Sequence, residues 1–450
     1  MSSLRKKAIQ GTIWTIAGYG ASQVLRLGSN LILTRLLLPE FFGLMALVNV
    51  FIIGLNLFSD VGLGPSIIQN KRGDDPDFLN TAWTIQVMRG VVLWLGSLLI
   101  AWPISHFYAK PELLWLIPIV GLATLISGFD STALLTLNRQ LAVGKLAIFE
   151  LMGQVISLIV MIVWAKFDPS IRALVAGTFV SAVFQLLWSH RLLPHQPNRF
   201  AWDKEAAQKI FTFGKWIFFS TALTFLASQA DRLILGKLIS AALLGIYGIA
   251  YTFADIPRSV ILALSGKVIF PTFAKLVGLP RETFRTKILK NRKLLLLALA
   301  AGLSILVGFG DYVIYFLYKK EYHQAAWMLP IIALGIWHTS LYSTMSPALL
   351  ALGKPIYNTL GYLFTLITIT IGLLVGYHSM KMPGAVIAVA VGDFPFYMVT
   401  MYGLWREKLG CLKQDLWTTA VFLSLLAAVL IVRVSLLHLG LPIDSMFKLN

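Results

Sequence analysis

Residues 294–317 read LLLLALAAGLSILVGFGDYVIYFL. An α-helix needs about 20 mostly apolar residues to cross the hydrocarbon core of a bilayer, and this run is long enough. Basic residues, ending at Arg292 and Lys293, come directly before it, as they do where a helix leaves the membrane on the cytoplasmic side. The segment therefore predicts a transmembrane helix.

Similar apolar runs recur along the whole chain and are joined by short polar loops. Hydrophobic residues make up 57% of the 450 residues, charged residues only 13%, and the mean hydropathy is +0.77, which excludes an ordinary soluble domain. The fold class is predicted to be all-α, a polytopic integral membrane protein with about 13 (12–14) transmembrane helices. These spans lie near residues 9–33, 41–66, 80–103, 112–136, 144–165, 171–190, 211–236, 243–270, 294–317, 325–351, 356–377, 384–405 and 416–438.

The net charge of +18 is spread over many loops and does not form one patch, so nucleic acid is not expected as a partner. Most of the 38 Lys and Arg fall on one side if the N-terminus is cytoplasmic, which is the orientation that the positive-inside rule favours. The largest basic cluster of that side contains Lys275, Arg281, Arg285, Lys287, Lys290, Arg292 and Lys293.

A weak internal repeat predicts two lobes of six helices. Residues 21–27 contain Ala-Ser-Gln, two residues and Arg-Leu, and the same pattern returns at residues 227–233. A loop with Pro194 and Pro197 lies midway between them. Six helices is an even number, so both lobes keep one orientation, as in transporters built from parallel repeats. The predicted domains are residues 1–205, residues 206–410, and residues 411–450 as an additional helix and tail.

Catalytic chemistry is not predicted. The sequence contains no Gly-rich phosphate loop that ends in Gly-Lys-Ser/Thr and no zinc-binding His-Glu-x-x-His pair, and the external loops are too short to form a catalytic domain. The single cysteine, Cys411, excludes an internal disulfide and a cysteine-rich metal site. A transporter without cofactor or metal, and not an enzyme, is therefore expected.

Charged residues inside predicted spans mark the candidate site, because a charge at mid-bilayer costs at least about 2.5 kcal/mol. Arg89 lies deep in the third span and has no acidic residue within one helical turn. Asp255 and Arg258 lie on one face of the eighth span, and Pro257 between them predicts a kink that would suit a gate. Asp255 and Arg258 either line a substrate cavity or form an ion pair that only holds helices together.

The remaining candidates fall into three groups. Arg26, Asp231 and Arg232 lie in the outer parts of their helices, where they line the cavity or reach to the interface. Asp393 and Glu150 are predicted as helix partners or proton carriers for coupling or gating. Asp60, near the inner end of the second span, belongs to the gating group or simply meets water.

Three segments carry a family resemblance. Residues 34–44 read TRLLLPEFFGL, residues 57–64 read LFSDVGLG, and residues 230–236 read ADRLILG. The chain resembles the Wzx-like oligosaccharide flippases and polysaccharide transporters of the colanic acid exporter type, from about residue 5 to residue 410. These proteins belong to the multidrug and polysaccharide flippase superfamily, of which the longer members commonly have fourteen spans.

The resemblance implies an alternating-access flippase in the bacterial inner membrane. Its cargo would be an undecaprenyl-diphosphate oligosaccharide for exopolysaccharide or lipopolysaccharide production, with Arg26, Arg89 and Arg258 as candidates for the diphosphate. A monomer is expected, with a polysaccharide polymerase and export machinery as further partners. A multidrug or peptidoglycan-precursor exporter of the same superfamily remains an alternative, and so do a membrane-embedded polysaccharide ligase or polymerase and a scaffold.

Overall fold

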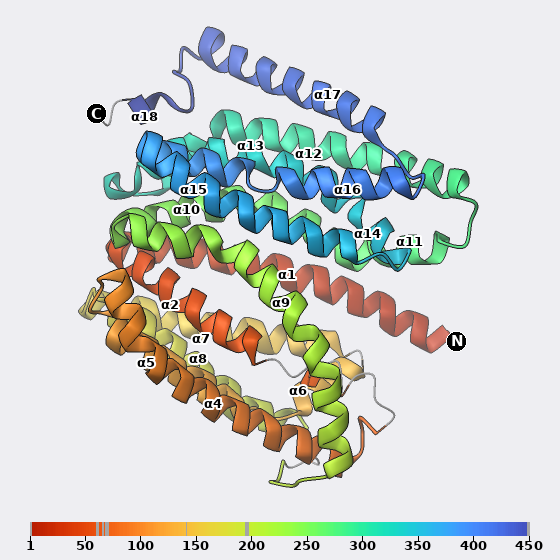
Figure 1. Ribbon diagram of the computed structural model, residues 1–450. Coiled ribbons are helices and arrows are strands. Elements are labelled where there is room, and N and C mark those ends of the chain that lie inside the picture. Colours follow the sequence, from red (N-terminus) through yellow and green to blue (C-terminus); the bar gives the residue numbers. More distant parts are fainter. Residues whose placement is uncertain are drawn as a thin grey trace. The chain divides into compact units, whose positions relative to one another are not determined.

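A computed structural model describes the chain as an array of helices in two compact units, Met1–Ala222 and Leu223–Asn450 (Figure 1). Every regular element among the described residues is helical, which confirms the predicted all-α class. The structure describes residues 2–59, 63–64, 67, 72–140, 142–193 and 198–447, with side chains for all of these except residues 2–13, 15–16, 143, 209, 211–220, 445 and 447.

The helices of the first unit are α1 (Ser2–Leu36), α2 (Pro39–Phe58), α4 (Pro76–Tyr108), α5 (Leu113–Gly128), α6 (Ala133–Arg139), α7 (Val143–Phe167) and α8 (Ile171–Leu192). Helix α9 (Lys204–Leu238) carries the chain into the second unit. There it is followed by α10 (Ala241–Leu264), the π-helical turn η1 (Ser265–Ile269), α11 (Phe270–Leu276), α12 (Arg281–Leu317), the 3-10 turn η2 (Lys320–Tyr322), α13 (Ala325–Ser343), α14 (Ser346–Ala351), α15 (Ile356–Val391), α16 (Phe394–Arg406), α17 (Leu412–Ile431), the π-helical turn η3 (Val432–Leu436) and α18 (Asp444–Phe447).

Many of the predicted membrane spans correspond to membrane-length helices. Within the described residues nine helical segments are long and apolar enough to cross a membrane, and the bent pair α5 and α6 makes a tenth. One of the nine, Ile356–Arg406, contains a break at Lys381, where φ is 56°. Helices α1 and α9, each 35 residues long, cover two further predicted spans. The chain is therefore a multi-pass membrane protein with at least nine membrane-length helical segments among its described residues.

Helix boundaries differ from the prediction where turn-forming residues interrupt apolar sequence. The second span was expected to reach residue 66, but α2 ends at Phe58, just before a stretch that contains Gly62, Gly64 and Pro65. The fourth span is not straight, because α5 and α6 meet at an angle of 63°. The Ser131 hydroxyl accepts a hydrogen bond from the N–H of Ala133 at 3.2 Å, which helps to start the second of these helices.

Small residues set the closest helix contacts of the first unit. A Cβ atom placed on Gly90 of α4 would lie 3.1 Å from the Cα atom of Gly128 of α5, so the two helices cross with their backbones almost touching. Helix α1 packs on α7, where Ser22 Oγ donates to Gln154 Oε1 at 2.9 Å. These contacts join α4 to α5 and α1 to α7 within the first unit.

Arg72 joins the starts of α4 and α9. Its Nη2 lies 2.8 Å from Oδ2 of Asp75 and 2.8 Å from Oδ2 of Asp203. Asp75 accepts from the N–H of Asp77, and Asp203 accepts from the N–H groups at the start of α9, so each carboxylate caps its helix. The hydrogen bonds from Arg72 lower the pKa of both carboxyls, and both therefore stay charged near neutral pH.

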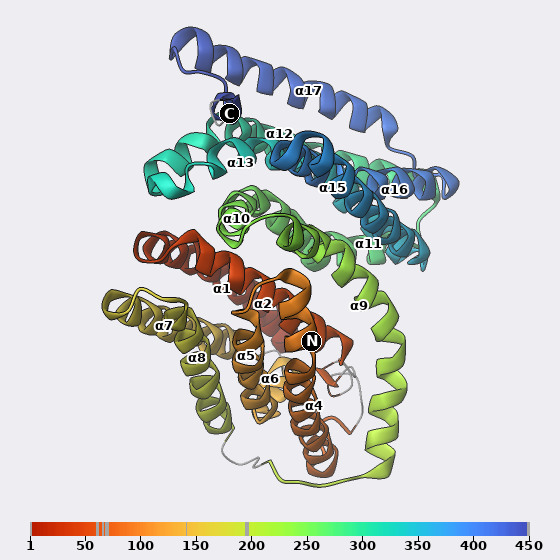
Figure 2. The same cartoon turned by 60° about the vertical axis from the view of Figure 1, so that its left-hand side comes forward.

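In the second unit α17 lies beside α12 along its length (Figures 1 and 2). Two buried ion pairs join them: Arg292 with Asp415 at one end, and Arg433, directly after α17, with Asp311 at the other. Arg433 donates from Nη1 to Oδ1 of Asp311 at 2.7 Å and from Nη2 to Oδ2 at 2.6 Å. All four side chains are at most 4% exposed, so the thirteenth helix is held to α12 by charges as well as by apolar packing.

Candidate functional site

Arg89 of α4 binds the C-terminal end of α2. Its Nε donates to Ser59 Oγ at 2.9 Å, and its Nη2 donates to the carbonyl oxygen of Asn56 at 2.7 Å. The last carbonyls of a helix lack intrahelical partners and carry partial negative charge, so a cation is stabilised there. Because α2 stops at Phe58, this acceptor is available next to the middle of α4.

Gln86, one turn before Arg89, binds the end of α5 in the same way. Its Nε2 lies 3.1 Å from the carbonyl oxygen of Gly128 and 2.9 Å from that of Asp130. Two polar residues of α4 thus satisfy the carbonyl ends of two neighbouring helices. Arg89 lies about 20 Å along α4 from its first residue, at a rise of 1.5 Å per residue. The ends of α2 and α5 that contact α4 here are therefore deep within a membrane-length helix.

A cavity of about 500 Å³ opens beside Arg89, entirely within the first unit. Apolar groups such as Ile52 and Leu93 contribute to it, but amides and hydroxyls from five helices dominate its polar lining, and none of its described lining residues is acidic. The polar lining residues are Asn49 and Asn56 of α2, Gln86 and Arg89 of α4, Thr124 and Ser127 of α5, Ser157 of α7, and Thr178, Ser181 and Gln185 of α8.

Arg258 of α10 is the centre of a charged cluster in the second unit. Its Nη2 lies 3.2 Å from Oδ2 of Asp393, and its Nε lies 3.9 Å from Oδ1 of Asp255, so the acid on the other helix is the nearer one. Asp393, at the start of α16, also accepts from the Thr339 hydroxyl at 2.7 Å. The cavity at this cluster measures only about 20 Å³, because the charged side chains fill it themselves.

Tyr251 links this cluster to α9. Arg258 Nη1 donates to the Tyr251 hydroxyl at 3.4 Å, and the Arg232 guanidinium lies 5.1 Å from the centre of the Tyr251 ring. Asp231, which is 5% exposed, accepts from the Tyr247 hydroxyl at 2.6 Å. The Tyr247 and Tyr251 rings are in turn neighbours, with centroids 5.9 Å apart. Five of the predicted candidates therefore belong to one polar network: Asp231, Arg232, Asp255, Arg258 and Asp393.

Two other predicted candidates, Arg26 and Glu150, are not part of this network. Arg26 is an exposed residue of α1, and Glu150 is an exposed residue of α7. Pro257 lies inside α10, which continues as one helix to Leu264 and is then followed by the π-helical turn η1. Asp60 lies outside the described residues.

The part of the cavity lining that α8 supplies was not predicted from the sequence. Thr178, Ser181 and Gln185 follow one another at helical spacing, and they would have marked one polar face of the sixth span. Arg292 was predicted to belong to a cytoplasmic loop cluster, but in the structure it is buried beside Asp415. Both acids of the seam between α12 and α17 lie more than 100 residues from their arginines, so their pairing had no local signal.

Comparison with known proteins decides the family. A family model described as "Polysaccharide biosynthesis protein" matches residues 32–327. The chain belongs to the polysaccharide biosynthesis protein family. This membership confirms the predicted resemblance.

Curated members of the polysaccharide biosynthesis protein family include two bacterial relatives. "Lipopolysaccharide biosynthesis protein WzxC" of Escherichia coli (strain K12) is 26% identical over 277 residues, which are 61% of this chain but only 56% of that protein. "Teichuronic acid biosynthesis protein TuaB" of Bacillus subtilis (strain 168) is 25% identical over 357 residues, 79% of this chain and 73% of the relative. This member of the family is therefore a multi-pass protein of a bacterial membrane.

Solved structures place this family member in the predicted fold. The "Lipid II flippase MurJ, inward closed conformation" aligns with a TM-score of 0.75 over 93% of this chain and 92% of that one, at 12% identity. An inward-facing "multidrug resistance MATE family transporter of the MOP superfamily" aligns with a TM-score of 0.70 over 86% and 94%, at 14% identity. At identities this low the alignments establish the fold alone, which this chain shares with both solved structures.

Proposed function

We propose that this protein is an alternating-access flippase that moves an undecaprenyl-diphosphate oligosaccharide across the bacterial inner membrane. The observation that carries the proposal is the cavity beside Arg89, which gathers amides, hydroxyls and one guanidinium inside membrane-length helices. Polar groups are costly in that environment and are a sign of function. The product would enter exopolysaccharide or lipopolysaccharide synthesis.

The lining chemistry favours a saccharide over an apolar drug. Sugar hydroxyls both donate and accept hydrogen bonds, as do the hydroxyls and amides of Asn49, Thr178, Ser181 and Gln185. A pocket for a drug-like compound is lined mostly by apolar and aromatic side chains with only a few polar groups. The ten polar residues of this lining therefore support a hydroxyl-rich cargo.

Arg89 is the proposed contact for the anionic part of the cargo. A guanidinium binds phosphate oxygens bidentately, and Arg89 lies on the cavity wall. Arg258 was an equal candidate by sequence, but it is surrounded by Asp255 and Asp393 in a cluster with little open volume. We assign this cluster to gating or coupling, and Arg26 stays a further candidate for the anion.

The remaining parts of the proposal concern organisation. The N-terminus is placed in the cytoplasm on the basis of the basic loops. The lobes are taken as residues 1–205 and 206–410, with residues 411–450 as an additional helix and tail, and the protein is taken to act as a monomer. A polysaccharide polymerase and export machinery are the proposed partners downstream of the flipped cargo.

Transport by liposome-reconstituted variants tests the role of the cavity. Asn49→Leu removes one amide from the lining, and Arg89→Gln removes the positive charge. A hydrogen bond from a charged group contributes about 1.5–3 kcal/mol. If Arg89→Gln loses such a bond to the cargo, its transport rate should fall at least tenfold. Arg172→Gln is the matched control, because Arg172 is an exposed residue at the start of α8.

Arg89→Gln also weakens the bonds at the end of α2, so Arg89→Lys is needed beside it. Arg89→Lys keeps a positive charge and should retain more transport than Arg89→Gln at equal folding. Equal transport by wild type, Asn49→Leu and Arg89→Gln would remove the cavity from the mechanism and overturn its assignment.

A further inference from the structure

Helix α12 is longer than a membrane span requires. Its 37 residues extend about 55 Å at 1.5 Å per residue, whereas the hydrocarbon core is about 30 Å thick. The apolar run begins at Leu294, so residues 281–293 project beyond the core at the end where α12 starts. Lys287, Lys290 and Lys293 of this projecting part are exposed.

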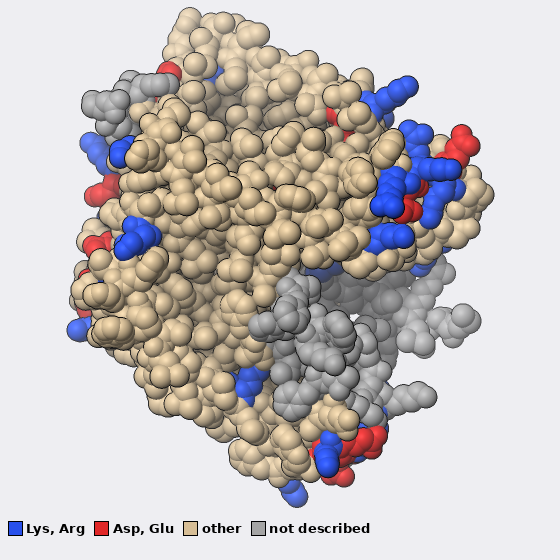
Figure 3. Space-filling model, in the orientation of Figure 1, with Lys and Arg blue, Asp and Glu red and all other residues tan. Residues whose placement is uncertain are grey.

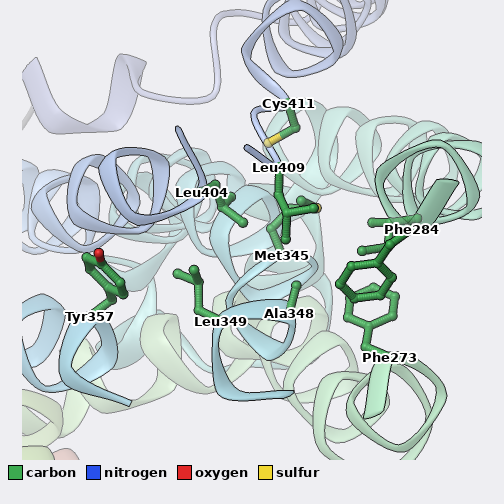
Figure 4. Packing of buried hydrophobic residues seen from close by; sticks show 10 residues of the cluster. Phe273, Phe284, Met345, Ala348, Leu349, Tyr357, Leu404, Leu409 and Cys411 are labelled. Carbon is green, nitrogen blue, oxygen red and sulfur yellow. The ribbon is translucent and has the colours of Figure 1, made fainter. Parts of the chain in front are cut away.

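The projecting part of α12 is built into the unit. Phe284 and Ile288 point into a core formed with Phe273 of α11 and with Leu409 and Cys411, which lie between α16 and α17 (Figure 4). Its position is therefore fixed by packing, unlike that of a free basic tail.

Two acidic side chains near this projecting part form ion pairs within the unit. Glu407 lies 3.8 Å from Arg281, and Asp415 is buried against Arg292, while Glu282 stays exposed. The charge that remains at the surface is mostly positive. Figure 3 shows Lys and Arg side chains gathered over this end of the second unit, with fewer Asp and Glu among them.

The basic residues of α12 meet α17 at one defined place. Lys293 Nζ lies 4.6 Å from the centre of the Trp417 ring. Lys290 is one turn before Lys293 on α12, and Lys413 is one turn before Trp417 on α17, so both lysines lie on the faces that this contact brings together. We call Lys290, Lys293, Lys413 and Trp417 the seam-end site.

Apolar side chains continue directly from the seam-end site toward the membrane core. Leu294 is 76% exposed, Leu416 is 63% exposed and Trp417 is 45% exposed. Tryptophan and lysine beside exposed leucines are typical of the level where headgroups meet acyl chains. An acidic soluble protein could pair with the lysines, but it would not contact the apolar side chains of Leu294, Leu416 and Trp417 within the membrane.

We propose that the seam-end site binds the headgroup of an anionic glycerophospholipid. Its phosphodiester would accept hydrogen bonds from Lys290, Lys293 and Lys413, and its acyl chains would lie along Leu294 and Leu416. A bound lipid would bridge the start of α12 and the start of α17 on the lipid side, opposite the buried pair of Arg292 and Asp415. The proposal does not depend on the cargo of the transporter.

Native mass spectrometry of the purified full-length protein, titrated with palmitoyl-oleoyl phosphatidylglycerol, tests the site. Each lysine near an anionic lipid headgroup strengthens binding of the lipid roughly fivefold. Lys290→Gln with Lys293→Gln should therefore weaken binding about 25-fold, and Lys413→Gln alone about fivefold. The matched control is Lys319→Gln with Lys320→Gln, two exposed lysines just beyond the other end of α12, which should change affinity less than twofold.

Phosphatidylcholine and undecaprenyl diphosphate serve as the other probes. The proposal predicts that phosphatidylcholine binds at least tenfold more weakly than phosphatidylglycerol and shows no loss in the seam-end variants. Equal binding of both glycerophospholipids, or an equal loss in the control variant, would overturn it. Tighter binding of undecaprenyl diphosphate with the same loss in the seam-end variants would assign the site to the cargo and would also overturn it.

Discussion

Arg433→Met removes one partner of a buried ion pair and tests how the thirteenth helix is held. In the wild type, Arg433 makes two parallel hydrogen bonds to Asp311 and also donates to the carbonyl oxygens of Gly308 and Gly440. The side chains of Arg433 and Asp311 are 3% and 4% exposed. Methionine is unbranched and uncharged, so Asp311 would be left buried without its counterion.

The expected cost is about 3–5 kcal/mol of unfolding free energy, which is the usual loss when one partner of a buried pair is removed. Replacing both partners, with Asp311→Leu and Arg433→Met, removes the uncompensated charge as well. Well-packed apolar replacements of a buried pair are often neutral, so this double variant should recover most of the loss. The single variant should therefore be less stable than the double variant.

Unfolding of the purified protein in mixed micelles with increasing dodecyl sulfate, followed by tryptophan fluorescence, would measure these differences. Lys319→Met is the control, because it removes an exposed cation at the same end of α12 and should change stability by no more than about 0.5 kcal/mol. A cost below about 1 kcal/mol for Arg433→Met, or a double variant no more stable than the single one, would refute the role of this pair.

Three further changes probe other parts of the structure. Gly90→Leu should lower the unfolding free energy by about 1–3 kcal/mol in the same assay, because a Cβ atom at this position would lie 3.1 Å from the Gly128 backbone. Gly248→Leu is the control and should be tolerated, because no atom lies within 4 Å of a Cβ atom placed on Gly248. Arg72 lowers the pKa of Asp75 and the pKa of Asp203. The ion pairs of these two carboxylates with Arg72 therefore stabilise the fold above about pH 4, and this stabilisation is lost as the pH falls through the folded-state pKa. Arg72→Gln should consequently be less stable than wild type at pH 7, with a smaller difference at pH 3, and an equal difference at both values would contradict this. Arg258→Met with Asp393→Leu should fold but fail to transport, and full transport by this double variant would exclude the cluster from gating.

Fold class and approximate span positions could be predicted from the sequence, because the length and polarity of each apolar run indicate a membrane-spanning helix without reference to its neighbours. A run such as residues 294–317 meets the length and polarity that a bilayer demands, whatever the neighbouring helices are. The exceptions are residues whose effect depends on packing. The early end of α2 at Phe58 and the bend between α5 and α6 occur where carbonyl groups find partners on α4, in Arg89 and Gln86.

Single site residues were easier to predict than their partners. Arg89, Arg258 and Asp393 stand out as charges within apolar spans, but the helix that each one faces is decided by tertiary packing. Arg258 has Asp255 on its own helix and nevertheless lies nearer to Asp393. Likewise, five helices contribute polar residues to the cavity beside Arg89, and only Arg89 of α4 was predicted among them.

Flipping of a fluorescent undecaprenyl-diphosphate oligosaccharide in protein-containing liposomes tests the proposed function most directly. A membrane-impermeant reductant destroys the label on the outer leaflet only, so a flippase makes the label on the inner leaflet accessible as well. The proposal predicts that wild-type protein raises the reduced fraction above that of empty liposomes, and that a cationic drug-like dye is not moved. Transport of the dye without movement of the oligosaccharide would contradict the proposal and would assign the protein to drug export.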